Sequence, residues 1–182
     1  MKNIEALEIH EAPGKSRQLL EDIAARRGSV GEMISTMAHS PALLEGFLTL
    51  SRSMKRSKLP RTTSEKISLA VQQWIGCGAC LQAHSDAARG LGLTESDIDL
   101  ARQGTSTDAR EAALIQFALQ ILAEPSAITP AEVEALRGHG WTDRSIIEVV
   151  GVVVLNQMTG SFNLVAGIEP AEDTAAPGPV AR

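Results

Sequence analysis

Both cysteines of this 182-residue chain lie in one short motif, Cys77-Gly78-Ala79-Cys80, and His84 follows four residues later. Glu65 precedes Cys77 by twelve residues. A Cys-x-x-Cys pair in a reducing compartment is typical of redox chemistry or metal binding rather than of a structural disulfide. The nearby His and Glu favour redox chemistry, because a thiol reacts as its thiolate and needs a neighbouring group to take the proton.

The spacing of the two cysteines and the histidine places all three on one face of a helix, because residues three and four apart are neighbours there. Cys80 and His84 are then one turn apart, within reach of a thiol–imidazole hydrogen bond. Both cysteines lie in or just before the first turn, where the helix dipole and free N–H groups favour an anion and lower a thiol pKa. The dipole alone favours Cys77 as the reactive thiol, so these arguments leave the order of the two cysteines open.

Glu65 reaches this cluster only if the chain turns back. In one straight helix the twelve residues between Glu65 and Cys77 would separate them by ~18 Å. Glycines on both sides of Cys77 predict a helix break there. After such a break, we expect the Glu65 carboxylate to orient the His84 imidazole, as the third member of a catalytic triad does. The alternative is that Glu65 only completes a capping box begun by Thr62.

The elements around this cluster are predicted to be all-α. Periodic apolar residues bounded by caps, Gly and Pro predict helices. They are expected over 16–27, 31–39, 40–56, 80–89 and 112–123, with others beginning at Thr62 or Thr63, Thr94, Thr129 and Thr142. Residues 149–155 have the propensity of a buried strand, but they follow a helix cap and no partner strand is evident, so we expect a helix.

Composition narrows the class of protein. Hydrophobic residues make up 43% of the chain, with three Phe, two Trp and no Tyr, which predicts an aliphatic core of packed helices. We expect one domain over residues 1–168 and a disordered tail over 169–182.

A net charge of −5 makes nucleic acid an unfavourable partner. The absence of an apolar run of roughly 18–20 residues and of a signal region predicts a cytoplasmic protein without a membrane partner.

The chain resembles the carboxymuconolactone decarboxylase-like family, and within it the AhpD-like alkylhydroperoxidase branch. The resemblance is carried by Glu65, followed after eleven residues by Cys77-x-x-Cys80-x-x-x-His84. It extends to Ser40–Leu44, Leu59-Pro60 and Phe162–Gly167. It implies an AhpD-like helical bundle that forms a homo-oligomer, a dimer, trimer or hexamer, and acts as a peroxidase without an organic or metal cofactor.

The resemblance also implies a role for each residue of the cluster. Cys80 attacks a small-molecule peroxide and Cys77 resolves the product into a disulfide, while Glu65 and His84 form a proton relay. A dithiol, a lipoyl group or a thioredoxin-like protein is the expected reductant. The chain departs from the best-studied members at Ala79, where they carry a second histidine.

Other interpretations of the cluster stay open at this stage. The two cysteines and His84 could be three zinc ligands, but none of the remaining histidines, His10, His39 and His139, has a suitable spacing for the fourth. The cysteines could be buried and inert. Two further functions are a lactone decarboxylase, which needs no cysteine pair, and a non-enzymatic redox sensor whose disulfide changes its assembly.

Two features outside the cluster are interpreted as structural. Trp74 is expected to pack in the core. Lys55, Arg56 and Lys58 form a small basic group that is expected to be an exposed helix end.

Overall fold

The computed structural model describes residues 2–171, and within them every regular element is a helix, as predicted. The helices in chain order are α1 (Gly14–Arg27), α2 (Glu32–Met37), α3 (Pro41–Met54), α4 (Arg61–Ile75), α5 (Gly78–Gly90), α6 (Glu95–Arg102), α7 (Ala109–Ala123), α8 (Pro130–Gly138) and α9 (Asp143–Ala166). Short 3₁₀ turns lie at Ile9–Glu11 and Pro125–Ala127. The predicted tail lies outside the described residues from 172 onward, and the boundary of a single domain at residue 168 stays a prediction.

Side-chain caps start several helices where the sequence predicts. The hydroxyl of Ser40 accepts the N–H of Leu43 at the start of α3. Thr94 and Thr129 form reciprocal capping boxes at α6 and α8, and Thr142 caps α9. Each cap satisfies backbone donors that have no partner inside the helix.

The predicted start of α4 was wrong. The helix begins at Arg61, directly after Pro60, and has no side-chain cap. Proline lacks an N–H and holds its backbone at a fixed φ, so a helix can start behind it without a hydroxyl cap. Thr63 is instead buried inside α4, where its hydroxyl donates to Glu111. Glu65 is therefore not part of a capping box.

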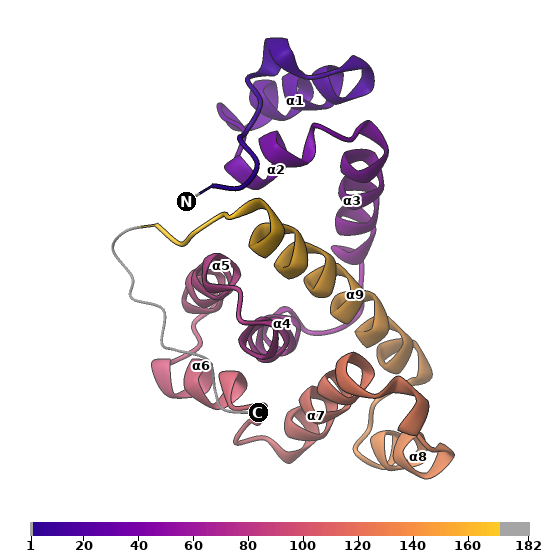
Figure 1. The fold of residues 1–182 in the computed structure, drawn as a ribbon. Helices are drawn as coiled ribbons and strands as arrows, with labels where there is room; N and C mark the ends of the chain where they lie inside the picture. Colours follow the sequence, from indigo (N-terminus) through magenta and orange to yellow (C-terminus); the bar gives the residue numbers. More distant parts are fainter. Residues whose placement is uncertain (1, 172–182) are drawn as a thin grey trace.

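The long helix α9 organises the fold. Figure 1 shows it running between α1–α3 on one side and α4–α8 on the other, and it packs against α3, α4, α5, α7 and α8. Residues 149–155 lie inside it, which excludes the strand alternative. The core between α4, α7 and α9 is aliphatic, as predicted, with fully buried side chains that include Ile67, Val71, Ile115, Val149 and Val153. Trp74 is not in the core, because 42% of it is exposed.

By length and composition alone, α9 is also apolar enough to cross a membrane, with a mean hydropathy of 1.5 and 39% of the tested segment buried. The prediction concerned an uninterrupted apolar run of roughly 18–20 residues, and polar residues such as Asn156 and Asn163 do interrupt α9, but its average hydropathy is still high enough to pass this test. One such helix among residues 2–171 is weak evidence for a membrane, since core helices pass the same test.

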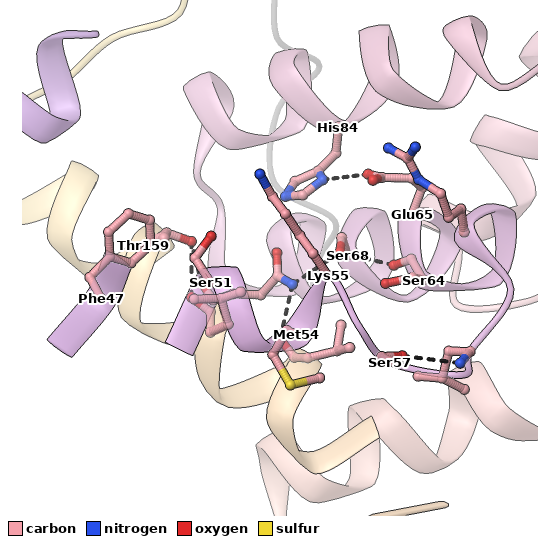
Figure 2. Close-up of a pocket in the computed structure, with 15 residues that line it drawn as sticks. Phe47, Ser51, Met54, Lys55, Ser57, Ser64, Glu65, Ser68, His84 and Thr159 are labelled. Atoms are coloured by element: carbon pink, nitrogen blue, oxygen red, sulfur yellow. Dashed lines mark hydrogen bonds and ion pairs between the residues drawn. The ribbon is translucent and has the colours of Figure 1, made fainter. Parts of the chain in front are cut away.

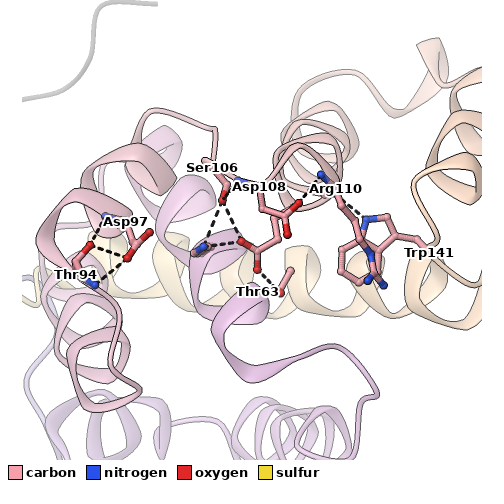
Figure 3. Close-up of polar contacts among 9 residues, drawn as sticks. Thr63, Thr94, Asp97, Ser106, Asp108, Arg110 and Trp141 are labelled. Atoms are coloured by element: carbon pink, nitrogen blue, oxygen red, sulfur yellow. Dashed lines mark hydrogen bonds and ion pairs between the residues drawn. The ribbon is translucent and has the colours of Figure 1, made fainter.

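A buried polar cluster joins α4 to α7 (Figure 3). Lys66 Nζ lies 2.5 Å from Glu111 Oε2, with 7% and 15% of the two side chains exposed. Thr63 and Ser106 donate to the same carboxylate at 2.7 and 3.0 Å. Burial by itself would raise the pKa of Glu111, but the hydrogen bonds from Lys66, Thr63 and Ser106 outweigh it and lower that pKa below its usual value. The cluster fixes the N-terminal half of α4, which carries Glu65.

Candidate active site

A glycine turn between α4 and α5 brings the predicted residues together. Gly76 has a φ of +85°, a conformation that favours glycine, and ends α4. The N–H groups of Gly76 and Cys77 both donate to the carbonyl of Gln72. The chain then enters α5 directly, and α5 packs back against α4. The predicted helix break is confirmed.

Glu65 and His84 meet across this turn, as predicted (Figure 2). The distance from His84 Nδ1 to Glu65 Oε2 is 2.7 Å, and 27% and 19% of the two side chains are exposed. An ionised carboxylate can only accept hydrogen bonds, so Nδ1 carries the proton in this pair. His84 Nε2 is left as the ring nitrogen that can exchange a proton with a reacting group.

The two cysteines form a disulfide at the start of α5. Both are buried, with 1% of Cys77 and 5% of Cys80 exposed. Cys77 is the N-cap of α5, and its sulfur accepts the backbone N–H of Cys80 at 3.3 Å. The prediction that this helix starts at Cys80 was wrong by two residues, because the sulfur takes the capping role that a hydroxyl usually has.

Asn163 is a site residue whose contact with the cysteines the sequence reasoning missed. Its side-chain Nδ2 lies 3.2 Å from the sulfur of Cys80 and 3.9 Å from that of Cys77. Asn163 comes from α9 and only 5% of it is exposed, while its Oδ1 has no hydrogen-bond partner among the described residues. One signal was available: Asn156 and Asn163 are seven residues apart on an apolar helix, so both lie on the same face.

A cavity of about 590 Å³ adjoins the Glu65–His84 pair (Figure 2). It lies between α3, α4, α5 and α9. Its lining comprises Phe47, Ser51, Met54, Lys55, Ser57, Leu59, Arg61, Ser64, Glu65, Ser68, His84, Val152, Leu155, Asn156 and Thr159. Of the four predicted site residues, Glu65 and His84 line this cavity, whereas Cys77 and Cys80 do not. Its volume is in the range of ordinary small-molecule sites.

Two cations in this lining were not predicted as site residues. Lys55 was expected to be only part of an exposed helix end, and Arg61 was not singled out. Among residues 2–171, no group of three or more His, Cys, Asp or Glu side chains is arranged to hold a metal ion.

The fold is that of the AhpD-like proteins. A structure from Ralstonia eutropha JMP134, described as an alkylhydroperoxidase AhpD core and an uncharacterized peroxidase-related protein, superposes with a TM-score of 0.81 at 21% identity, covering 94% of this chain and 93% of that one. The debrominase Bmp8 superposes with a TM-score of 0.74 at 18% identity, covering 93% of this chain and 92% of its own. A cysteine-to-alanine variant of Bmp8 has been solved with 2,3,4-tribromopyrrole.

The chain is similar to the carboxymuconolactone decarboxylase family, whose family model matches residues 41–124. The matched segment runs from α3 to the end of α7 and contains Glu65, both cysteines and His84. The uncharacterized protein YdfG of Bacillus subtilis is 26% identical over 141 residues, which cover 75% of this chain and 93% of YdfG. The resemblance predicted from the Glu/Cys/Cys/His spacing is confirmed by this match.

Proposed function

We propose that the protein is a thiol-dependent peroxidase that reduces organic hydroperoxides or hydrogen peroxide. The observation that carries the proposal is the combination of a Cys77–Cys80 disulfide with a hydrogen-bonded Glu65–His84 pair one helical turn away, beside a cavity of substrate size. A redox-active thiol pair needs a proton carrier and a place for its substrate. The Glu65–His84 pair offers the first, and the cavity that this pair lines, although the two cysteines do not, offers the second.

The proposed catalytic cycle begins with Cys77 and Cys80 in the reduced, dithiol form. His84 takes the proton of Cys80, and the thiolate attacks the outer oxygen of the hydroperoxide. An S–O bond forms while the O–O bond breaks, which gives the Cys80 sulfenic acid and an alkoxide. The alkoxide takes the proton back from His84 and leaves as an alcohol. Glu65 holds the imidazole with Nδ1 protonated throughout.

Cys77 completes the oxidation. Its thiol condenses with the Cys80 sulfenic acid, forming the disulfide and releasing one water. An external dithiol, such as a lipoyl group or a thioredoxin-like protein, then returns two electrons and two protons to the pair by thiol–disulfide exchange. The need for such a reductant is the reason that we place the protein in the cytoplasm.

The order of the cysteines is argued from two competing contacts. The capping position and the N–H of Cys80 favour negative charge on Cys77. The amide of Asn163 lies closer to Cys80 than to Cys77, and it favours negative charge there. We assign Cys80 as the attacking thiol, because His84 is one turn along the helix from it and the Asn163 N–H points at it.

Peroxide consumption with a dithiol reductant tests the function. We expect turnover in the wild type and its loss in both Cys77→Ser and Cys80→Ser. Cys80→Ser that turns over normally would refute the nucleophile assignment. Stoichiometric oxidation with a change in assembly and no turnover with any reductant would favour the redox sensor, while lactone decarboxylation that survives thiol alkylation would favour the decarboxylase.

Association through α9 is part of this proposal. Ile147, Val150 and Val154 follow one face of α9, and 69%, 39% and 46% of them are exposed. An apolar strip of this kind on an isolated subunit favours burial against another copy. We therefore propose a homo-oligomer.

A further inference from the structure

The cavity beside His84 has a charge that differs from that of the whole chain. Lys55 and Arg61 line it, and Glu65 is the one acidic side chain that the described residues contribute to its lining. Glu65 is already bonded to His84. The chain as a whole carries a net charge of −5. A cavity with an excess of positive charge in an acidic protein favours an anionic ligand.

The two cations are available to a ligand. No side-chain hydrogen bond or ion pair of Lys55 or Arg61 is formed within residues 2–171, whereas Arg89, Arg137 and Arg144 are all paired with carboxylates. Lys55 comes from the end of α3 and Arg61 from the first residue of α4. Figure 2 shows the Lys55 side chain extending toward the His84 end of the cavity.

The other residues that line the cavity suit an organic ligand rather than a small inorganic anion. Apolar side chains from α3, from the α3–α4 connection and from α9 form much of the lining: Phe47, Met54, Leu59, Val152 and Leu155. Hydrogen peroxide would leave this surface unused, and a neutral hydroperoxide would leave both cations without a partner. Apolar walls with a few charged groups are typical of sites that orient an organic ligand by one polar end.

We propose that the substrates of this site are organic hydroperoxides that carry a carboxylate, which Lys55 and Arg61 bind while the apolar lining holds the hydrocarbon part. This inference rests on the proposed peroxidase function for the hydroperoxide group, but the carboxylate recognition rests on the cavity alone. The peroxide end is thereby directed to the part of the cavity that Glu65 and His84 line.

A matched pair of substrates tests the inference. Cumene hydroperoxide and its para-carboxylate share the same hydroperoxide and differ by one negative charge. We expect the wild type to have a higher kcat/KM for the carboxylate. Lys55→Met and Arg61→Met each keep an apolar side chain and remove the charge, and we expect each to lower this preference about two- to fivefold, the range of an ion pair that keeps contact with water.

Lys58→Met is the matched control, because it removes one positive charge from the same exposed connection but Lys58 does not line the cavity. We expect it to leave the preference between the two substrates unchanged. An equal kcat/KM for the two substrates in the wild type would overturn the proposal. So would a preference that survives in both Lys55→Met and Arg61→Met.

A binding measurement separates this inference from the peroxidase proposal. Calorimetric titration with 4-isopropylbenzoate, which has no peroxide group, should show binding to the wild type and weaker binding to Lys55→Met and Arg61→Met. No binding to the wild type would overturn the inference. Binding with this pattern but no peroxide turnover would uphold the carboxylate site and refute the peroxidase.

Discussion

Replacing Asn163 with leucine tests whether its amide makes Cys80 the attacking thiol. Leucine has a similar volume but no N–H to donate to the sulfur that lies 3.2 Å away. A hydrogen bond to a charged group contributes about 1.5–3 kcal/mol. Its loss should therefore lower the fraction of Cys80 present as thiolate by about 10- to 150-fold at a pH where the thiol is mostly protonated. At high pH, where both variants are fully ionised, the difference should vanish.

The assay is the rate of iodoacetamide alkylation of the reduced protein across pH. In a Cys77→Ser background the rate reports Cys80, and in a Cys80→Ser background it reports Cys77. We expect a smaller effect on Cys77, because Asn163 Nδ2 lies 3.9 Å from its sulfur. Leu164→Ala, at an exposed neighbouring position on α9, controls for changes in the helix itself.

Two results would refute this reasoning. A rate deficit of Asn163→Leu that persists at high pH would mean that the introduced side chain blocks access rather than changing the charge of the thiol. A larger loss of alkylation rate at Cys77 than at Cys80 would mean that the Asn163 amide stabilises the thiolate of Cys77 more than that of Cys80. The assigned order of the two thiols would then have to be reversed.

Three further predictions concern the relay, the buried ion pair and the exposed face of α9. His84→Ala should lower peroxide turnover at neutral pH by about 10²–10⁴-fold, and Glu65→Gln by less; unchanged pH profiles of thiol alkylation in both would show that these residues are structural. Glu111→Gln should lower the free energy of unfolding by about 3 kcal/mol, measured by urea denaturation, because it leaves Lys66 buried without its partner. Folding lowers the pKa of Glu111. The stability that the ionised carboxylate contributes is therefore fully present above the unfolded pKa near 4.5 and is lost as the pH falls through the lower folded-state pKa. The difference in free energy of unfolding between the wild type and Glu111→Gln should accordingly shrink in acid. Ile147→Asp combined with Val154→Asp should give a smaller assembly by light scattering, and a monomeric wild type at micromolar concentration would contradict the association.

Local signals in the sequence were enough to predict much of the fold. Hydroxyl residues followed by apolar periodicity placed the starts of α3, α6, α8 and α9, because capping depends on residues within one turn. The glycines around Cys77 predicted the break after α4, but they did not fix the direction of α5, so the meeting of Glu65 with His84 was an expectation that the packing of α5 on α4 bears out.

What the sequence could not supply depends on contacts between distant segments. Asn163 reaches Cys80 across 83 positions of the chain, and no spacing rule connects them. Lys55 is an exposed residue at the end of α3, as predicted, but its place in the cavity lining could not be predicted, because the cavity exists only once α9 has packed against α3 and α4. The exposure of Trp74 also depends on contacts between distant segments, because an aromatic residue at the end of a helix is buried only if another segment packs over it.

The position of α9 divides the site into two parts that can change separately. Glu65, the two cysteines and His84 all lie inside the segment that the family model matches, whereas Asn163 and the cavity residues Val152, Leu155 and Thr159 lie after it. A substitution on this helix can therefore alter the shape or polarity of the cavity without changing Glu65, Cys77, Cys80 or His84. Such a layout allows point substitutions in a single helix to change the shape and polarity of the cavity while the Glu/Cys/Cys/His motif stays the same.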